Sequence, residues 1–310
     1  MYNSIEKLRH SLESVIRGKS DILDLALTCV LAGGHLLIED VPGVGKTTLA
    51  QVLARSLGCT FHKIQFTSDL LPSDLIGVSV FNPKMNEFEF RPGPLFAHVI
   101  LADEINRTTP KTQSALLEAM NEKQITVDGN TYTLPQPFIV IATQNPIEHH
   151  GTYPLPESQL DRFLMRIRMG YPDSAGEKQI LRDQTAGGYR DLNAVMSGNE
   201  LLAVQEEVAR VKFNDVLEDY LMAIVNRTRN TEYLSLGISP RGSVGLYRAA
   251  QAEAYLHGRD YVVPDDVKKL AVPVLAHRVV ISARYTTVLK KSEEAEGIIG
   301  QILEEVEVPA

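Results

Sequence analysis

Apolar and polar residues in the first half of the chain follow two patterns that alternate along the sequence. Short, nearly continuous apolar runs are typical of strands buried on both faces, and between them apolar residues recur every three or four positions, as on one face of a helix. Strands that alternate with helices predict a parallel sheet covered by helices on both sides. The predicted strands are 35–39, 62–66, 99–104, 138–142 and 164–169, and the predicted helices are 4–16, 20–32, 49–57 and 110–120.

Two further segments, 78–90 and 125–134, predict β-hairpins inserted beside the buried strands. In each, two stretches of alternating residues flank a loop rich in turn residues. The second loop is Asp128-Gly129-Asn130, and an Asp-Gly pair favours a tight hairpin turn. The alternative is that both segments are plain edge strands of the main sheet.

The pattern changes at residues 170–173, Gly-Tyr-Pro-Asp, and from there the periodicity is helical. We therefore expect two domains, an α/β domain over 1–170 and a small, all-helical domain over 171–310. The helices predicted in the second domain are 174–186, 200–211, 214–229, 240–257 and 264–277.

Composition restricts the class of protein. A chain of 310 residues has room for two domains, and its 44% hydrophobic and 23% charged content is ordinary for a soluble protein. It contains no apolar run of membrane-spanning length, and residues 1–10 lack the apolar core of a signal peptide. Cys29 and Cys59 lie in apolar surroundings, which predicts free thiols and a cytoplasmic location. The formal net charge of −8 argues against non-specific binding of nucleic acid.

The clearest chemistry lies in residues 40–48, Asp-Val-Pro-Gly-Val-Gly-Lys-Thr-Thr, between a buried strand and a helix. In that context a glycine-rich loop places backbone N–H groups and a helix N-terminus against phosphate groups. We expect Lys46 to reach the β- and γ-phosphates, and the Thr47 hydroxyl to bind Mg²⁺. The alternative is an ordinary glycine-rich turn before a helix. The predicted phosphate-binding residues are Gly43, Val44, Gly45, Lys46, Thr47 and Thr48.

Asp40 departs from this pattern, which has glycine at the first position. Aspartate is among the few residues that tolerate left-handed backbone, so we expect that conformation at Asp40. We expect the substitution to adjust the geometry of the loop without loss of binding.

Phosphoryl transfer also needs a metal ion and a group that orients the attacking water. Asp103 and Glu104 end a buried strand, where Asp103 suits a role near Mg²⁺ and Glu104 is placed to activate water. Asn145 ends the next buried strand, where its amide could hold the water or the γ-phosphate. The alternatives are a surface pair of acids and an ordinary Asn-Pro turn.

Positive charge opposite the transferred group is the remaining requirement, and Arg162 and Arg241 are the candidates. Arg241 lies in the first turn of a helix, against the preference of the helix dipole, which suggests a bound anion nearby. Either residue could instead be a solvated surface arginine. Arg166 and Arg168 are rivals to Arg162, but their alternation places both on one face of a strand and favours a structural role.

Several segments together resemble the MoxR family of AAA+ ATPases, and the resemblance covers nearly the whole chain. They are Val-Pro-Gly-Val-Gly-Lys-Thr, Leu-Ala-Asp-Glu-Ile-Asn-Arg, Lys-Thr-Gln-Ser-Ala-Leu-Leu-Glu-Ala-Met, Ala-Thr-Gln-Asn-Pro, Gln-Leu-Asp-Arg-Phe and Ile-Ser-Pro-Arg. The resemblance implies a P-loop NTPase core with a parallel sheet between helices, followed by a small all-α lid domain. It also implies two β-hairpin inserts, and the predicted hairpins fall in the expected places.

The same resemblance implies a role for each candidate residue. Lys46 and Thr47 match Walker A, Asp103 and Glu104 match Walker B, Asn145 matches sensor 1, Arg162 the arginine finger, Arg241 sensor 2, and Gly18 a loop that borders the adenine. The implied cofactors are ATP and Mg²⁺, and the implied assembly is a ring, usually a hexamer, in which each finger completes a neighbour's site. The implied partners are proteins with von Willebrand factor A domains, which this chain would engage in trans.

We therefore expect a motor that hydrolyses ATP to remodel, assemble or mature other proteins. One alternative is a nucleotide-dependent binding switch in which hydrolysis is incidental. Another is a motor acting on DNA, which the acidic residues Glu87, Glu89 and Asp128 of the hairpins make less favourable.

Overall fold

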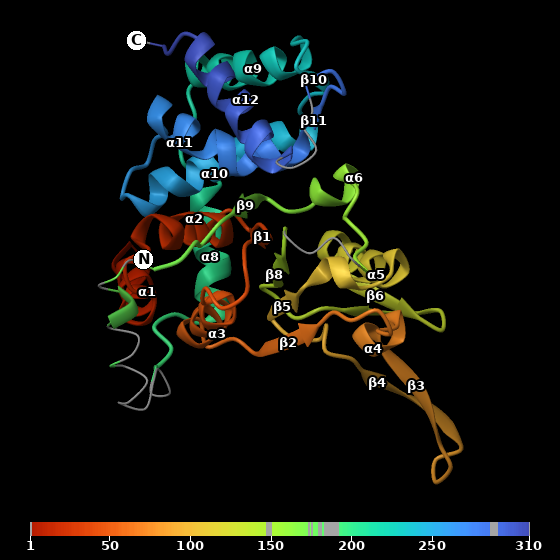
Figure 1. The fold of residues 1–310 in the computed structure, drawn as a ribbon. Coiled ribbons are helices and arrows are strands. Elements are labelled where there is room, and N and C mark those ends of the chain that lie inside the picture. The colour runs from red at the N-terminus through yellow and green to blue at the C-terminus, as the bar shows by residue number, and fades with distance from the viewer. Residues whose placement is uncertain are drawn as a thin grey trace.

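The centre of the molecule is a five-stranded sheet with the strand order β2-β5-β8-β1-β9, in which all neighbouring strands are parallel (Figure 1). The computed structural model describes residues 2–146, 151–172, 174, 176–178, 182, 192–285 and 291–309. The strands are β1 (Leu36–Glu39), β2 (Phe61–Gln65), β5 (Val99–Asp103), β8 (Ile139–Gln144) and β9 (Met165–Ile167). They are the five strands that the sequence predicts, with ends that differ by one or two residues.

Helices cover both faces of this sheet, as predicted. They are α1 (Tyr2–Val15), α2 (Ser20–Leu31), α3 (Lys46–Ser56), α4 (Pro72–Ile76), α5 (Pro110–Glu122) and α6 (Glu157–Leu160), with a 3₁₀ turn at Ile105–Arg107. Leu36 and Ile38 of β1 pack with α1, α2 and α3, whereas Leu37 between them packs with α5 on the other face. The short helices α4 and α6 are not predicted, because five and four residues are too few to show a helical period.

The strand order predicts a ligand-binding position beside β1. The chain leaves β1 and continues to β2 at one edge of the sheet, but β9, on the opposite side of β1, is reached last. In open parallel sheets, such a reversal of direction opens a crevice outside the carboxyl ends of the strands, where ligands bind. The residues that follow β1, β5 and β8 therefore share one edge of the sheet.

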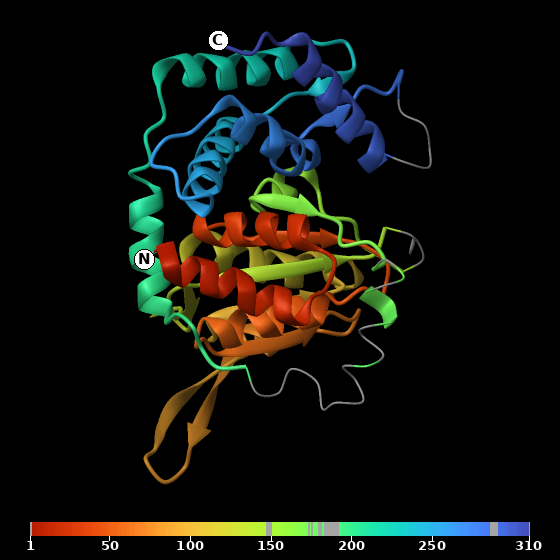
Figure 2. The same ribbon diagram turned by 90° about the vertical axis from the view of Figure 1, so that its left-hand side faces the viewer.

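Both predicted hairpins are present and separate from the main sheet, so the edge-strand alternative is wrong. The first pairs β3 (Gly77–Asn82) with β4 (Glu87–Pro92), and the second pairs β6 (Gln124–Val127) with β7 (Asn130–Thr133). Asp128 and Gly129 both have positive φ, as the Asp-Gly signal predicts. The β3–β4 hairpin projects from the body of the molecule (Figure 2).

The second half of the chain is helical, with one short two-stranded sheet. Its elements are α8 (Gly198–Val208), α9 (Asp215–Arg229), β10 (Leu234–Leu236), α10 (Pro240–Leu256), α11 (Pro264–Leu275), a 3₁₀ turn at Ala276–Arg278, β11 (Val280–Ile281) and α12 (Lys291–Glu305). Four predicted helices are confirmed, and the one predicted over 174–186 lies mostly outside the described residues. In the part of the chain that the structure describes, no helix is both long and apolar enough to cross a membrane.

Helix α12 and the β10–β11 pair were not expected from the sequence. Gly297 and Gly300 lie inside α12, and each glycine costs about 1 kcal/mol of helix propensity relative to alanine. Tertiary packing overrides this cost, because Ala295, Ile299 and Ile302 share one face and are buried.

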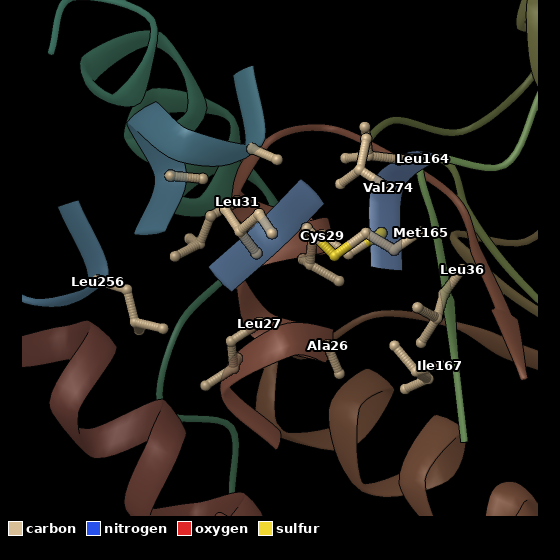
Figure 3. Close-up of a cluster of buried hydrophobic side chains, with 14 of the residues drawn as sticks. Ala26, Leu27, Cys29, Leu31, Leu36, Leu164, Met165, Ile167, Leu256 and Val274 are labelled. Carbon is tan, nitrogen blue, oxygen red and sulfur yellow. The ribbon is translucent and has the colours of Figure 1, made fainter. Parts of the chain in front are cut away.

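Helix α2 joins the sheet to the helical half. Its side chains contact β9 on one side and α10 and α11 on the other, within one apolar cluster (Figure 3). Cys29 lies inside this cluster, close to Met165, and burial raises the pKa of its thiol to about 12. Cys29 and the half-buried Cys59 are both free thiols, as predicted.

Candidate active site

The phosphate loop, residues 40–48, connects β1 to α3 at the carboxyl edge of the sheet. Gly43 (φ +87°) and Gly45 (φ +97°) have left-handed backbone, which glycine adopts at little cost. A Cβ placed on Gly43 would meet no other atom within 4 Å, so the loop borders open space. Gly45 is the N-cap of α3, whose first N–H groups have no partner within the helix. This geometry suits a phosphate anion.

Lys46 is buried, and its Nζ donates a hydrogen bond to the carbonyl oxygen of Asp40 at 2.8 Å. Burial lowers the pKa of Lys46, and the negative charges of Asp103, Asp40 and Glu104 oppose the shift. Lys46 follows β1 in the phosphate loop, and Asp103 and Glu104 lie where β5 ends, so all three are at the carboxyl edge of the sheet. The fold brings together the three residues that the sequence assigns to one site.

The prediction of left-handed backbone at Asp40 is wrong. The non-glycine residues with positive φ in the described chain are Asn86, Glu104, Lys123 and Asp128. Asp40 is not among them, and its carboxylate instead accepts hydrogen bonds from the N–H of Val41 (2.8 Å) and the N–H of Gly170 (2.5 Å). Asp40 therefore acts through its side chain and does not replace the conformational freedom of a glycine.

Asp103 is the last residue of β5, and both of its carboxylate oxygens have partners. The hydroxyl of Thr143 donates to Oδ1 at 2.7 Å, and Nζ of Lys63 lies 2.8 Å from Oδ2. Burial raises the pKa of Asp103, but hydrogen bonds from Lys63 and Thr143 and the charges of Lys63 and Lys46 outweigh burial and lower the pKa overall. The carboxylate is ionised at neutral pH, as an oxygen ligand for a cation must be.

Glu104 has left-handed backbone (φ +58°, ψ +50°), which is uncommon for a residue other than glycine and often marks a functional site. Its N–H donates to the Thr143 hydroxyl at 2.8 Å. Its side-chain Oε2 accepts a hydrogen bond from Gln65 at 2.8 Å and lies 3.3 Å from Nε of Arg107. The carboxylate is therefore held at the end of β5 by groups from both sides.

Oxygen donors that suit Mg²⁺ occur at the same edge. Mg²⁺ usually keeps several waters and binds through one or two protein oxygens together with substrate phosphates. The Thr47 hydroxyl, in the first turn of α3, and the Asp103 carboxylate fit that requirement. Among the described residues, no three His, Cys, Asp or Glu side chains form a cluster that could hold a metal ion unaided.

Asn145 follows β8 and is buried, with 6% of its surface exposed. Because β8 lies between β1 and β5, this position is between the phosphate loop and Asp103. The placement suits the predicted contact of Asn145 with a water molecule or a γ-phosphate.

Arg162 and Arg241 both lie near Asp161. The guanidinium of Arg162 donates to the carbonyl oxygen of Leu117 in α5 at 2.6 Å. Arg241, 55% exposed, lies 3.9 Å from Oδ2 of Asp161. The anion that the position of Arg241 suggests is therefore present within the chain, as the Asp161 carboxylate.

Arg166 and Arg168 are engaged in a cluster of ion pairs at the end of β9. Arg166 lies 3.0 Å from Glu296 of α12 and 3.6 Å from Glu39, and Arg168 lies 3.1 Å from Glu296 and 3.5 Å from Glu39. The Ser292 hydroxyl donates to the same Glu39 carboxylate at 2.5 Å. These contacts place both arginines on one face and support the structural role.

Gly18 lies in the short connection between α1 and α2 and has positive φ (+69°). The adjacent Lys19 donates from Nζ to the carbonyl oxygen of Tyr171 at 2.6 Å. The connection is thus bonded to the segment that follows β9.

Sequence reasoning missed Lys63, Gln65 and Thr143, which hold the two carboxylates at the end of β5. Lys63 and Gln65 alternate on β2, a strand that no motif marks. Thr143 stands in the quoted Ala-Thr-Gln-Asn-Pro segment, two residues before Asn145. The position of β5 between β2 and β8 explains all three contacts.

The whole chain is similar to known proteins. Residues 35–165 match the family described as "ATPase family associated with various cellular activities (AAA)", and residues 226–298 match an AAA lid domain. The chain is 39% identical to the protein named Chaperone MoxR1 of Mycobacterium tuberculosis, over 99% of this chain and 83% of that protein. It is 50% identical to the uncharacterized protein YeaC of Bacillus subtilis, over 96% of this chain and 92% of that protein.

Solved structures agree with this result. The crystal structure of a Cytophaga hutchinsonii protein described as a "putative ATPase" superposes with a TM-score of 0.89. The match covers 100% of this chain and 96% of that chain at 38% sequence identity. The α/β core and the helical lid therefore occur together in a related protein.

Proposed function

The chain belongs to the MoxR family of AAA+ ATPases, and from this membership we propose that it binds Mg²⁺ and ATP at the phosphate loop and hydrolyses ATP to remodel partner proteins. The observation that carries the proposal is the convergence of Lys46, Asp103 and Glu104 at the carboxyl edge of one parallel sheet. Each of the three has a part in phosphoryl transfer, and they come from two segments that are distant in the sequence.

We assign a different role in binding or hydrolysis to each residue of the site. Backbone N–H groups of residues 43–48 and Nζ of Lys46 would bind the phosphates, and Lys46 would exchange its present bond to the Asp40 carbonyl for a phosphate oxygen. Thr47 and Asp103 would hold Mg²⁺, which supplies positive charge to the phosphate oxygens. Glu104 would accept a proton from the attacking water, with Asn145 as a second group that orients it.

We propose that the active form is a ring, as the family resemblance implies, and that Arg162 of one subunit completes the site of its neighbour. This role requires Arg162 to exchange its bond to the Leu117 carbonyl for a phosphate oxygen. Arg241 would respond to the nucleotide from the lid, which we place after residues 170–173. The expected location is the cytoplasm, and the expected partners are proteins with von Willebrand factor A domains.

A second candidate function, a nucleotide-dependent switch with incidental hydrolysis, has one observation in its favour. Gln65 and Arg107 both contact Oε2 of the Glu104 carboxylate, and Oε2 would have to release them before it could accept a proton from water. In a switch of this kind, ATP binding would assemble the ring and turnover would be slow.

Replacing the base tests the proposal. Glu104→Gln should keep ATP binding within about two-fold and reduce turnover by at least about 100-fold, because the amide cannot accept the proton. Glu87→Gln, the same change on the exposed β4 strand, is the matched control and should leave turnover unchanged. Turnover by Glu104→Gln at the wild-type rate would exclude Glu104 as the base.

The dependence of the specific ATPase rate on protein concentration separates the assembly models. A rate that rises with concentration would support a site completed between subunits, and its loss in Arg162→Ala would support Arg162 as the finger. A constant rate in a protein that remains monomeric throughout would contradict the ring. Tight ATP binding without turnover would favour the switch.

A further inference from the structure

The segment that follows β9, Met169-Gly170-Tyr171, lies against the phosphate loop; we call it the exit segment, because the chain continues from it toward the helical half. Gly170 donates its N–H to Oδ2 of Asp40 at 2.5 Å. A Cβ placed on Gly45 would lie 3.7 Å from Cε of Met169. Tyr171 accepts the hydrogen bond from Lys19 on the other side. The exit segment therefore contacts two loops that are distant in sequence.

Asp40 is the residue through which this contact reaches the loop. It is 8% exposed, and each of its polar groups has a partner. Its N–H donates to the carbonyl oxygen of Gln144 at 3.1 Å, and its own carbonyl oxygen accepts from Lys46 at 2.8 Å. Its carboxylate accepts from Val41 at 2.8 Å and from Gly170. One residue thus connects the ends of β1, β8 and β9 to the lysine of the site.

Glycine at position 170 favours this arrangement. Its φ of +62° is in the left-handed region, where a side chain is strained, and this conformation aims its N–H at Asp40. Hydrogen bonds to a carboxylate are stronger than those between neutral groups, and both of these start from backbone N–H groups that lose no side-chain entropy. The link is therefore a rigid one.

We propose that Asp40 is a positioning residue whose carboxylate fixes the phosphate loop to the exit segment. The affinity of the loop for nucleotide then depends on the position of the exit segment. This inference rests on the proposed function and adds to it a residue that touches no phosphate. It also gives Asp40 a reason to differ from the glycine of the phosphate-loop pattern. A movement of the helical half that shifts Gly170 would alter the loop directly.

Two substitutions at Asp40 test the proposal in the full-length chain, with MgATP and MgADP as the ligands. Asp40→Gly restores the pattern residue but removes both acceptors, so Kd and KM should rise by about ten-fold while kcat changes by less than about two-fold. Asp40→Asn keeps one carbonyl acceptor in its side chain, so its Kd and KM should lie between those of the wild type and Asp40→Gly. Asp69→Gly and Asp69→Asn, made in an exposed loop, are matched controls and should bind as the wild type does.

Amide hydrogen exchange in the absence of nucleotide provides a second, independent measurement. Asp40→Gly should speed exchange in peptides that cover 40–48 and 168–172 and leave α5 unchanged. A merely structural role would lower the stability of the whole chain and leave the ratio of KM to kcat as it is.

The two proposals fail in different ways. If the wild type binds no ATP, the proposed function is wrong, and the inference about Asp40 falls with it. If the wild type binds and Asp40→Gly binds equally well with unchanged exchange, only the inference is wrong. If Asp40→Gly binds ATP more tightly, the inference is also wrong, because the carboxylate would then be acting by repulsion.

Discussion

Two clusters of charged and polar groups near strand ends differ in the solvent exposure of their cationic side chains. The edge cluster consists of Lys46, Lys63, Gln65, Asp103 and Glu104. The residues that we call the junction cluster form two groups of ion pairs around β9: Asp161 with Arg278, and Arg166 with Glu39 and Glu296. The Lys63 side chain of the edge cluster is 38% exposed, whereas those of Arg166 and Arg278 in the junction cluster are 9% and 2% exposed. Their carboxylate partners are alike, since Asp103 is 16% exposed and Asp161 is 18% exposed.

The difference in burial implies a difference in role. A half-exposed ion pair contributes little to stability, so its members can exchange partners when a ligand arrives. A buried pair is costly to break, because removal of one partner leaves an uncompensated charge. The edge cluster can therefore serve chemistry, and the junction cluster can fasten the helical half to the sheet.

Arg278 shows how the junction cluster works. Its guanidinium lies 2.7 Å from Asp161 and donates to the carbonyl oxygen of Phe163 at 2.6 Å. Burial lowers the pKa of Arg278, and the charge of Asp161 opposes that shift. One side chain from the helical half thus pairs a carboxylate and a carbonyl of the segment before β9.

The largest effect that we predict is at this residue. Arg278→Met should lower the free energy of unfolding by about 3–5 kcal/mol, because Asp161 loses its closest cationic partner and the carbonyl of Phe163 loses a buried donor. Arg227→Met is the matched control, since Arg227 pairs with Glu305 where both side chains are more than 40% exposed, and it should cost less than about 1 kcal/mol. Urea unfolding of both variants measures the difference, and equal costs would remove the distinction between the two clusters.

The sequence predicts those members of the edge cluster that lie within a recognisable motif. The loop 40–48 and the pair Asp103-Glu104 each follow an apolar run, so strand, turn and chemistry appear together in one short segment. Lys63 and Gln65 were not predictable, because they reach the site through the pairing of β2 with β5. The sequences of these two strands do not show that they are neighbours in the sheet.

The junction cluster was almost invisible in the sequence. Its partners are far apart, as Glu39 and Glu296 show, and α12 itself was missed because of its two glycines. The alternation of Arg166 and Arg168 was the only usable signal, and it correctly placed both on one face. At Asp40 the sequence marked an exception but gave the wrong reason, since a side-chain bond to Gly170 cannot be inferred from local backbone preference.

The next effect in size concerns Gln65 and would show that the edge cluster exchanges partners. Gln65→Leu removes one of the two donors to the Glu104 carboxylate, so turnover should rise by about three-fold to ten-fold, because less must be broken before Glu104 meets water. The free energy of unfolding should change by less than about 1 kcal/mol. Gln124→Leu, on the exposed start of β6, controls for the added apolar surface. A fall in turnover would mean that Gln65 positions the base and does not restrain it.

The smallest effect concerns Lys63 and is a change in how the free energy of unfolding depends on pH. The pKa of Asp103 is lowered in the folded chain, so this carboxylate stabilises the fold above its ordinary value of 3.8 and loses that contribution as the pH falls through the lower, folded value. Lys63→Met removes the hydrogen bond and charge that lower the pKa. The variant should therefore lose less stability than the wild type between about pH 5 and pH 3.

At neutral pH the same substitution should cost less than about 1 kcal/mol, because 38% of the Lys63 side chain is exposed and water screens the pair. Lys111→Met, on the exposed side of α5, is the matched control and should leave the pH dependence unchanged. Thermal unfolding measured across this pH range gives both quantities. If Lys63→Met instead costs as much at neutral pH as Arg278→Met, the Lys63–Asp103 pair is a structural fastening, and exposure at the sheet edge does not separate chemistry from support.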